Sequence, residues 1–276
     1  MNSFVQFANS HGLIIDHLVH GRIARCKTTT HRSKRNGAYY FAGQWGWCQN
    51  WQTDDEITIW QDGTVQPEEI QKQIKQSKEK HAKDRAKSNA AAAKKARLIL
   101  SQCKQELHSY LHDKGFSEMC GNVWFKSDSD PVLVVPMFIN KTISGCQLID
   151  VHGGKKFLSG QASKGAYFQI GSGRQVFFVE GYASALSLQK ILASLKISYR
   201  IVVCFSAGNL LNLAKCTSGF VIADNDESKA GESAAIDSGC NWWMPPTVGQ
   251  DINDYHRQAG VFKVSQELKK VLFNRS

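Results

Sequence analysis

The feature that most constrains the fold is a unit of apolar strand, polar strand end and helix that occurs three times between Gln175 and Ile236. The segments read QVFFVEGYASALSLQKIL, YRIVVCFSAGNLLNLAK and GFVIADNDESKAGESAAI. A short apolar run followed by a helix with its apolar positions on one face predicts a strand that leads into a helix. Because such alternation is typical of a parallel sheet flanked by helices, the expected fold class is α/β.

Carboxylates stand where these strands end. Glu180 follows the first apolar run, and Asp224 follows the third, with Asp226 two residues later. A further acidic segment, GQDINDYH, contains Asp251 and Asp254. Ligands bind at the carboxyl edge of open α/β sheets, where the ends of parallel strands meet. We therefore expect acidic side chains from separate segments to converge at this edge.

Converging carboxylates favour a bound cation. They repel one another and raise each other's pKa values unless a divalent ion lies among them. Oxygen ligands without His or Cys favour Mg²⁺ or Mn²⁺ over zinc. The alternative is that Asp224 caps the following helix and Asp226 is a surface charge.

The segment 66–110 is predicted to be a long basic helix that starts near Pro67, a residue suited to a first helical turn. It contains eleven Lys and Arg against five Asp and Glu, so 11 − 5 = +6 of the chain's net charge of +10 lies there. We expect a largely solvated basic helical linker between two folded parts. An arm that contacts nucleic acid is the alternative.

Residues 1–65 are predicted to form a small β-rich module after a short helix around Phe4–His11, because glycines punctuate several short strand-like runs. Basic and aromatic residues occur together here, a combination that can follow a phosphate backbone and stack bases. The alternative is that the aromatic residues fill a small core. The basic residues are Arg22, Arg25, Lys27, Arg32, Lys34 and Arg35, and the aromatic ones Tyr39, Tyr40, Trp45, Trp47 and Trp51.

The 8 cysteines are scattered without a C-x-x-C pair, which favours reduced thiols. Cys26, His31 and Cys48 lack a fourth ligand and the spacing of a zinc site, so no structural zinc is expected. No apolar run has the length of a membrane helix, and the N-terminus lacks the pattern of a signal peptide. We expect a soluble, cytoplasmic protein that does not bind membranes.

Two glycine-containing turns have simpler explanations than a nucleotide fingerprint. The segment FSAGN, with Ser206 and Gly208 before a helix, either binds a phosphate through backbone amides or permits close packing. The segment GSGRQ, residues 171–175, precedes a strand instead of following one, so we expect a hairpin turn.

Three segments together resemble a known family. EGYASALSL, VIADNDESKAGESAA and PPTVGQDINDYH are similar, in order and spacing, to the motifs of the Toprim domain. This domain is shared by bacterial-type primases, type IA and type II topoisomerases, recombination mediators and certain nucleases. The resemblance implies that Glu180 acts as general acid or base and that Asp224 and Asp226 hold magnesium. Asp251 matches the next acidic motif, whose second acidic position is occupied by Asn253.

The resemblance extends upstream of these motifs. PVLVVPMFINKTISGCQLIDVHGGKKFLSGQASKGAYFQIG resembles the basic subdomain that precedes Toprim in primases. It implies that Lys155, Lys156 and Lys164 bind triphosphate or template, with Lys156 and Lys164 as the closer matches; exposed solubilising lysines are the alternative. Lys229 in ESKAG is a further candidate, unless it only neutralises Glu227 or Glu232.

The whole chain is similar to primases of phages, plasmids and mobile elements. The implied organisation is a degenerate zinc-ribbon-like module (1–65), a basic helical linker (66–110), the basic N-terminal part of the catalytic core (111–174) and a Toprim domain (175–276). The implied function is synthesis of RNA primers on single-stranded DNA from ribonucleoside triphosphates, with Mg²⁺ or Mn²⁺. A separate helicase is expected as partner, since no Walker A motif is present. A metal-dependent Toprim nuclease and a non-catalytic DNA-binding or recombination accessory protein are the alternatives.

Overall fold

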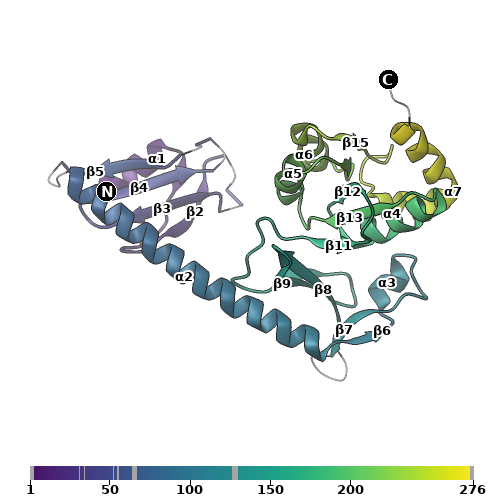
Figure 1. Ribbon diagram of the computed structural model, residues 1–276. Coiled ribbons are helices and arrows are strands. Elements are labelled where there is room, and N and C mark those ends of the chain that lie inside the picture. The colour runs from purple at the N-terminus through teal and green to yellow at the C-terminus, as the bar shows by residue number, and fades with distance from the viewer. Residues whose placement is uncertain are drawn as a thin grey trace. The chain divides into compact units, whose positions relative to one another are not determined.

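The computed structural model describes residues 3–30, 32–33, 35–51, 53–54, 56–63, 67–125 and 130–273. Over these residues the protein is mixed α/β, with seven helices and three five-stranded sheets (Figure 1). The chain divides into two compact units between Lys83 and Asp84. None of the helices in the described part of the chain is long and apolar enough to cross a bilayer.

The first unit is an antiparallel sheet with one short helix. The elements are α1 (Ser3–Ser10), β1 (Leu13–Ile14), β2 (Ala24–Thr28), β3 (Gly37–Phe41), β4 (Trp45–Asn50) and β5 (Thr58–Gln61). The strands pair in chain order. Phe4 and Ala8 of α1 pack on apolar side chains of the sheet, among them Tyr39 and Phe41. Helix α1 lies close to β4, since a Cβ on Gly46 would stand 2.6 Å from the Phe4 ring.

Helix α2 (Pro67–Gln102) starts at Pro67, as the sequence predicts, but ends before the expected limit near residue 110. A second antiparallel sheet follows, in the order β10-β9-β8-β7-β6. Its elements are β6 (Lys104–Glu106), α3 (Ser109–Asp113), β7 (Gly121–Phe125), β8 (Pro131–Ile139), β9 (Thr142–Ile149) and β10 (Lys155–Phe157). Ala96 and Ile99 of α2 pack on one face of this sheet, and Leu111 of α3 packs on the other.

The third sheet contains the predicted strand and helix units. It has the order β11-β13-β12-β14-β15, in which β13, β12, β14 and β15 are parallel and β11 is antiparallel to β13. The elements are β11 (Phe168–Ile170), β12 (Gln175–Val179), α4 (Tyr182–Ser194), β13 (Tyr199–Val203), α5 (Ala207–Lys215), β14 (Phe220–Ile222), α6 (Ala230–Ser238), β15 (Asn241–Trp243) and α7 (Ile252–Phe273).

The predicted hairpin at residues 171–175 is wrong. Strand β11 pairs with β13 and not with β12, so the glycine segment crosses from one strand to another that is not its neighbour. A Cβ on Gly173 would stand 2.3 Å from the backbone nitrogen of Tyr199, so this segment passes directly against the start of β13.

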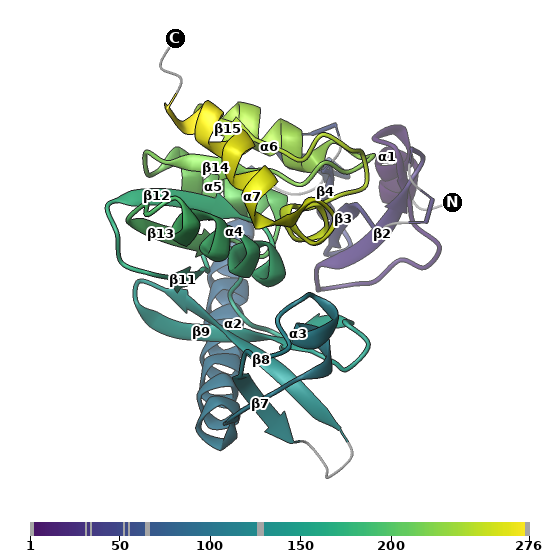
Figure 2. The ribbon, with the colours of Figure 1, turned by 90° about the vertical axis from the view of Figure 1, so that its right-hand side faces the viewer.

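Helices cover both faces of the third sheet. Leu188 of α4 and Leu268 of α7 pack on one face, and Leu210 of α5 and Ala235 of α6 pack on the other. Figure 1 shows the ribbons of these helices beside the sheet. Figure 2 shows α7 beside α4. Since the strands are covered on both faces, their carboxyl edge is the place where polar side chains from several strands can meet.

We expect Gly231→Ala to destabilise the protein by roughly 1–3 kcal/mol because of overpacking. A Cβ at Gly231 would stand 2.6 Å from the carbonyl oxygen of Asp224, so α6 would have to move away from the end of β14. Gly208→Ala, in the first turn of α5, is the matched control, because a Cβ there meets nothing within 4 Å. Urea unfolding measures both; equal stability of the two variants would contradict the close contact.

Candidate functional site

The parallel strands end at a common edge that carries the acidic residues. Val179, the last residue of β12, pairs with Val203 of β13 and with Ile222 of β14. Glu180 is therefore one residue beyond this level, and Asp224 is two residues beyond it. The sheet register alone brings these two carboxylates to the same edge.

Asp224 is the central group of this edge. Its Oδ1 is fully buried and has no hydrogen-bond partner. Burial, with the negative charges of Asp251, Glu180 and Asp226, raises the pKa of the Asp224 carboxyl to about 7. Burial also raises the pKa of Glu180, with a smaller effect of Asp226. Lys155 lowers both pKa values, so its positive charge acts on the Asp224 and Glu180 carboxyls.

Asp226 has a different environment from Asp224. Its Oδ1 accepts a hydrogen bond from the Ser228 hydroxyl at 2.5 Å and one from the Ala230 N–H at 3.3 Å. These donors, Ser228 first, lower the pKa of Asp226. Asp226, and not Asp224, therefore accepts a hydrogen bond from the first N–H of α6, whose N-cap is Lys229.

Asn225, between the two aspartates, brings Asp251 to the edge. Its N–H donates to the Gln250 carbonyl at 3.1 Å, and its Nδ2 donates to the Pro245 carbonyl at 2.9 Å. Its own carbonyl accepts from the Gly249 N–H at 2.6 Å. Sequence reasoning missed this role, although an amide flanked by two carboxylates at a strand end was a visible signal.

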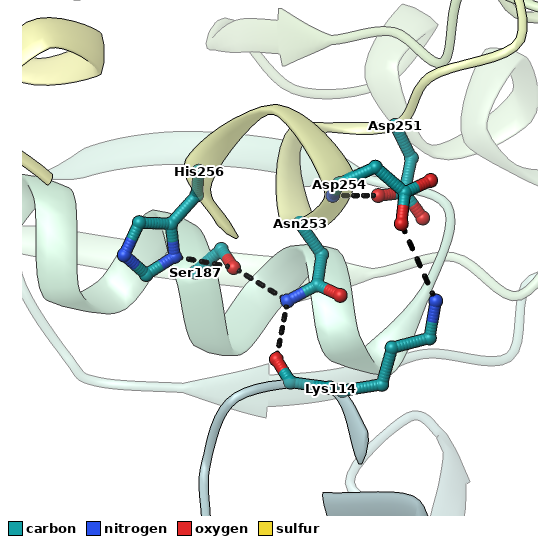
Figure 3. Close-up of polar contacts among 6 residues, drawn as sticks. All are labelled: Lys114, Ser187, Asp251, Asn253, Asp254 and His256. Atoms are coloured by element: carbon teal, nitrogen blue, oxygen red, sulfur yellow. Dashed lines mark hydrogen bonds and ion pairs between the residues drawn. The ribbon is translucent and has the colours of Figure 1, made fainter. Parts of the chain in front are cut away.

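Asp251 itself caps the start of α7. Its Oδ1 accepts from the Asp254 N–H at 2.9 Å (Figure 3). The carboxylate of Asp254 forms an ion pair with Lys114, with 3.6 Å between Nζ and Oδ1. The Asp254 carboxylate is therefore paired with Lys114. The negative charge of Asp251 instead raises the pKa of Asp224.

Asn253 occupies the second acidic position of the Toprim-like motif, and its side chain connects α7 to other segments. It is fully buried, and its Nδ2 donates to the Lys114 carbonyl and to the Ser187 hydroxyl oxygen, both at 2.9 Å (Figure 3). Nδ1 of His256 lies 2.9 Å from the same Ser187 oxygen. Since that oxygen already accepts from Asn253, its proton is available for His256, whose pKa is lowered mainly by burial.

Four buried side-chain polar atoms of the described residues have no hydrogen-bond partner. In the described part of the chain they are Tyr110 Oη, Asp224 Oδ1, Gln250 Oε1 and Asn253 Oδ1. Gln250 and Asn253 are close to Asp251 in sequence, and the Asp251 charge acts on both Asp224 and Tyr110. Unpaired buried polar groups are rare in native proteins and call for a water, an ion or a ligand. Tyr110, on α3, was not predicted from the sequence, because α3 is remote from the acidic motifs along the chain.

The lysines of β10 face opposite ways. Lys155 pairs with Ile149, and its Nζ lies 6.0 Å from the centroid of the Tyr110 ring. Lys156 pairs with Leu148, which packs on the side of the sheet covered by α2. Since neighbouring residues of a strand alternate between its faces, Lys155 lies beside the carboxylates and Lys156 does not.

The other two predicted lysines are exposed. Lys164 lies in the loop between β10 and β11. Lys229 precedes α6 in a left-handed conformation with φ of 56°. In the described part of the chain it forms no ion pair with Glu227 or Glu232, so the neutralising role considered for it is not observed.

The donor set fits a hydrated magnesium ion better than a dehydrated metal site. Over the described residues, no three or more His, Cys, Asp or Glu side chains are arranged so that they could hold a metal ion. Magnesium, however, usually keeps several waters and binds through one or two carboxylates together with substrate phosphates. The unpaired oxygen of Asp224, surrounded by carboxylates, suits that mode of binding.

The first unit uses its cysteines and several aromatic residues as core. Burial raises the thiol pKa of Cys26 to about 11 and that of Cys48 to about 12, and both belong to the apolar core. His31 and Lys34 lie outside the described residues. Tyr39 and Trp45 are each only 2% exposed, so they cannot stack bases.

Trp51 is the exposed aromatic residue of this group, at 47%. The guanidinium carbon of Arg25 lies 3.7 Å from the centroid of its ring, which is a cation–π contact. The basic and aromatic combination predicted for this module is therefore confined to fewer residues than the sequence indicates.

Comparison of the chain with protein-family models, with curated proteins and with solved structures gives no match.

We expect the metal-free protein to lose stability as the pH rises from about 4 to about 8. The Asp224 pKa lies above its ordinary value of 3.8, at about 7, so the folded state holds a proton that the unfolded state releases. At about 1.36 kcal/mol per pKa unit, the free energy of unfolding falls by up to about 4 kcal/mol over this range.

Asp224→Asn is the matched variant, because its amide has nearly the same shape and no charge. Urea unfolding in the presence of a chelator should show the two proteins equally stable near pH 4 and the variant more stable near pH 8. Parallel pH profiles would contradict the raised pKa of Asp224.

Proposed function

We propose that this chain is a Toprim-type DNA primase that synthesises short RNA primers on single-stranded DNA for replication of a phage, plasmid or other mobile element. The supporting observation is the unpaired, buried oxygen of Asp224 among other carboxylates at the carboxyl edge of the parallel strands. In this proposal residues 175–276 are the Toprim domain, and 111–174 are the basic N-terminal part of the catalytic core. Residues 66–110 are the linker, and 1–65 are a degenerate zinc-ribbon-like module.

The reaction requires charge neutralisation and alignment more than covalent chemistry. A primer 3′-hydroxyl attacks the α-phosphorus of an incoming ribonucleoside triphosphate, the new P–O bond forms, and pyrophosphate leaves with the electron pair. Asp224, with Asp226 or Asp251, would hold Mg²⁺ or Mn²⁺, which neutralises the phosphate oxygens when bound.

The remaining roles belong to side chains of this protein. Glu180, whose pKa burial raises, would accept the proton of the attacking hydroxyl. Lys155 lies beside the carboxylates, and Lys164 lies in an exposed loop; both would bind phosphate as point charges. Lys156 lies away from the carboxylates, and Lys229 lies at the start of α6. Both would contact the template strand. The Tyr110 hydroxyl would donate a hydrogen bond into the site.

The proposal implies three partners besides metal: a single-stranded DNA template, ribonucleoside triphosphates and a separate replicative helicase. It also implies a cytoplasmic location, where replicating DNA is found. The charge of the chain, +10, is of the sign that such phosphate-rich partners require.

We expect the double substitution Asp224→Ala and Asp226→Ala to abolish primer synthesis and to leave DNA binding mostly intact. The measurement is recovery of labelled oligoribonucleotides from single-stranded DNA, ribonucleotides and Mg²⁺ or Mn²⁺. Asp237→Ala, an exposed aspartate on α6, is the control and should be fully active. Unchanged synthesis in the double variant would refute the site. Shortened DNA would indicate a nuclease, and DNA binding with neither product would indicate an accessory protein.

We expect Tyr110→Phe to reduce primer synthesis by about tenfold without loss of stability, because the hydroxyl that it removes has no partner within the protein. Tyr255→Phe is the control, since the Tyr255 hydroxyl donates to Glu267 Oε1 at 2.8 Å. Neither residue belongs to the acidic group around Asp224. This control should lose about 1 kcal/mol of stability and keep its activity. Full activity of Tyr110→Phe would exclude its hydroxyl from the reaction.

A further inference from the structure

The loop that carries Lys164 is held by one buried side chain, that of Asn209. The Asn209 Nδ2 donates to the Ala166 carbonyl at 2.6 Å and to the Cys204 carbonyl at 2.8 Å. Its Oδ1 accepts from the Gly165 N–H at 2.7 Å. Asn209 is 7% exposed, so these bonds are made out of contact with water.

The three bonds use both donors and the acceptor of the amide, a combination that few side chains offer. Gly165 has φ of 76°, and the Ala166 N–H bonds to the Ser163 carbonyl at 3.1 Å, so the loop is a tight turn by itself. The turn fixes the shape of the loop, whereas Asn209 fixes its place against the third sheet.

The same side chain connects the loop to the acidic edge. The Cys204 N–H donates to the Val179 carbonyl, and the Phe205 N–H donates to the Glu180 carbonyl, both at 2.8 Å. A continuous series of hydrogen bonds therefore leads from Gly165 through Asn209 and the end of β13 to Glu180. Ser206 completes it by capping α5, where its Oγ accepts from the Asn209 N–H at 3.3 Å.

We propose that Asn209 is a positioning residue that holds Lys164 at the carboxylate edge, where the lysine binds phosphate groups of nucleotide or template. The identity of the ligand bound by Lys164 rests on the function proposed above. A lysine has a flexible stem, so a fixed loop reduces the conformational entropy lost when its ammonium group binds phosphate. Asn209 contacts no substrate in this account and acts only through the loop.

The first test does not depend on the reaction. Trypsin cleaves after Lys164, and the N–H of the cleaved bond is the one that Asn209 accepts. In Asn209→Ala we expect cleavage at this bond about tenfold faster than in the native chain, with cleavage after Lys141 unchanged. Asn212→Ala, an exposed residue on the same helix, is the control. Equal cleavage after Lys164 in native and variant proteins would show that Asn209 does not hold the loop.

Asn209→Asp separates hydrogen bonding from packing. It has nearly the same volume, but its carboxylate has no donor for the carbonyls of Ala166 and Cys204. We expect cleavage after Lys164 to be as fast in Asn209→Asp as in Asn209→Ala. If Asn209 acted only by packing, cleavage of Asn209→Asp would be as slow as that of the native chain. If Asn209→Ala does not fold, as judged by circular dichroism, Asn209→Ser replaces it, because the serine side chain is too short to reach the loop.

The second test uses primer synthesis. For Asn209→Ala we expect KM for ribonucleoside triphosphate to rise about tenfold with kcat within about twofold, and Lys164→Ala to do the same. The double variant should be no worse than either single variant, because both act on one contact. A rise in KM for DNA instead of nucleotide would assign Lys164 to the template. Additive effects, or a loss of kcat alone, would contradict the proposal.

If the native chain makes no primers, the proposed function fails, but the positioning of Lys164 by Asn209 is still tested. Binding of a fluorescent ribonucleoside triphosphate and of single-stranded DNA then replaces the kinetics. Weaker binding of one of them by both Asn209→Ala and Lys164→Ala supports the positioning role. Unaltered binding of both ligands would overturn the positioning role, even if trypsin cleaves after Lys164 faster in Asn209→Ala.

Discussion

The repulsion among carboxylates at one edge of a parallel sheet is the constraint on which the rest of this structure depends. The register of β12 and β14 brings Glu180 and Asp224 to the same edge, because they lie one and two residues beyond the ends of strands that are covered on both faces. Asp224 has its Oδ1 buried and unpaired, which raises its pKa to about 7. A fold does not gain stability from such a group. Its cost is understandable if the group binds a cation during function.

Neutral amide side chains hold this charged edge together. Asn225 ties the end of β14 to the segment that carries Asp251, Asn253 ties the start of α7 to Ser187 and the backbone of Lys114, and Asn209 ties the Lys164 loop to β13. An amide offers donors and an acceptor without adding charge, so it can be buried beside carboxylates at a lower cost than Lys or Asp. The positive charge that acts on both Asp224 and Glu180 is that of Lys155. In the proposed primase, these ties would keep the acidic groups and the phosphate-binding lysines at a constant separation.

The sequence predicted the parts of the site that depend on strands, and missed those that depend on pairing between distant segments. Apolar runs ending in Glu180 and Asp224 were sufficient to place both at one sheet edge, because the geometry of parallel strands is local to each strand and helix unit. The hydrogen bonds that Asp226 accepts from Ser228 and Ala230 depend on the turn between β14 and α6. Whether Lys155 or Lys156 lies beside the carboxylates depends on which face of β10 meets α3. The pairing of β11 with β13 depends on how the chain crosses between strands, which composition does not determine. Tyr110 lies in a core cluster that joins α3 to β8, β9 and α4, which are all distant from it in sequence.

Calorimetric titration of Mg²⁺ and of Mn²⁺ into the protein with bound ribonucleoside triphosphate tests the central claim most directly, with Asp224→Asn as the comparison. The account predicts saturable uptake by the native protein and a loss of at least about tenfold in affinity in the variant, since a carboxylate ligand is replaced by a neutral amide. Absence of uptake by the native protein, or equal affinity in both, would contradict a cation site at the edge where Asp224 lies.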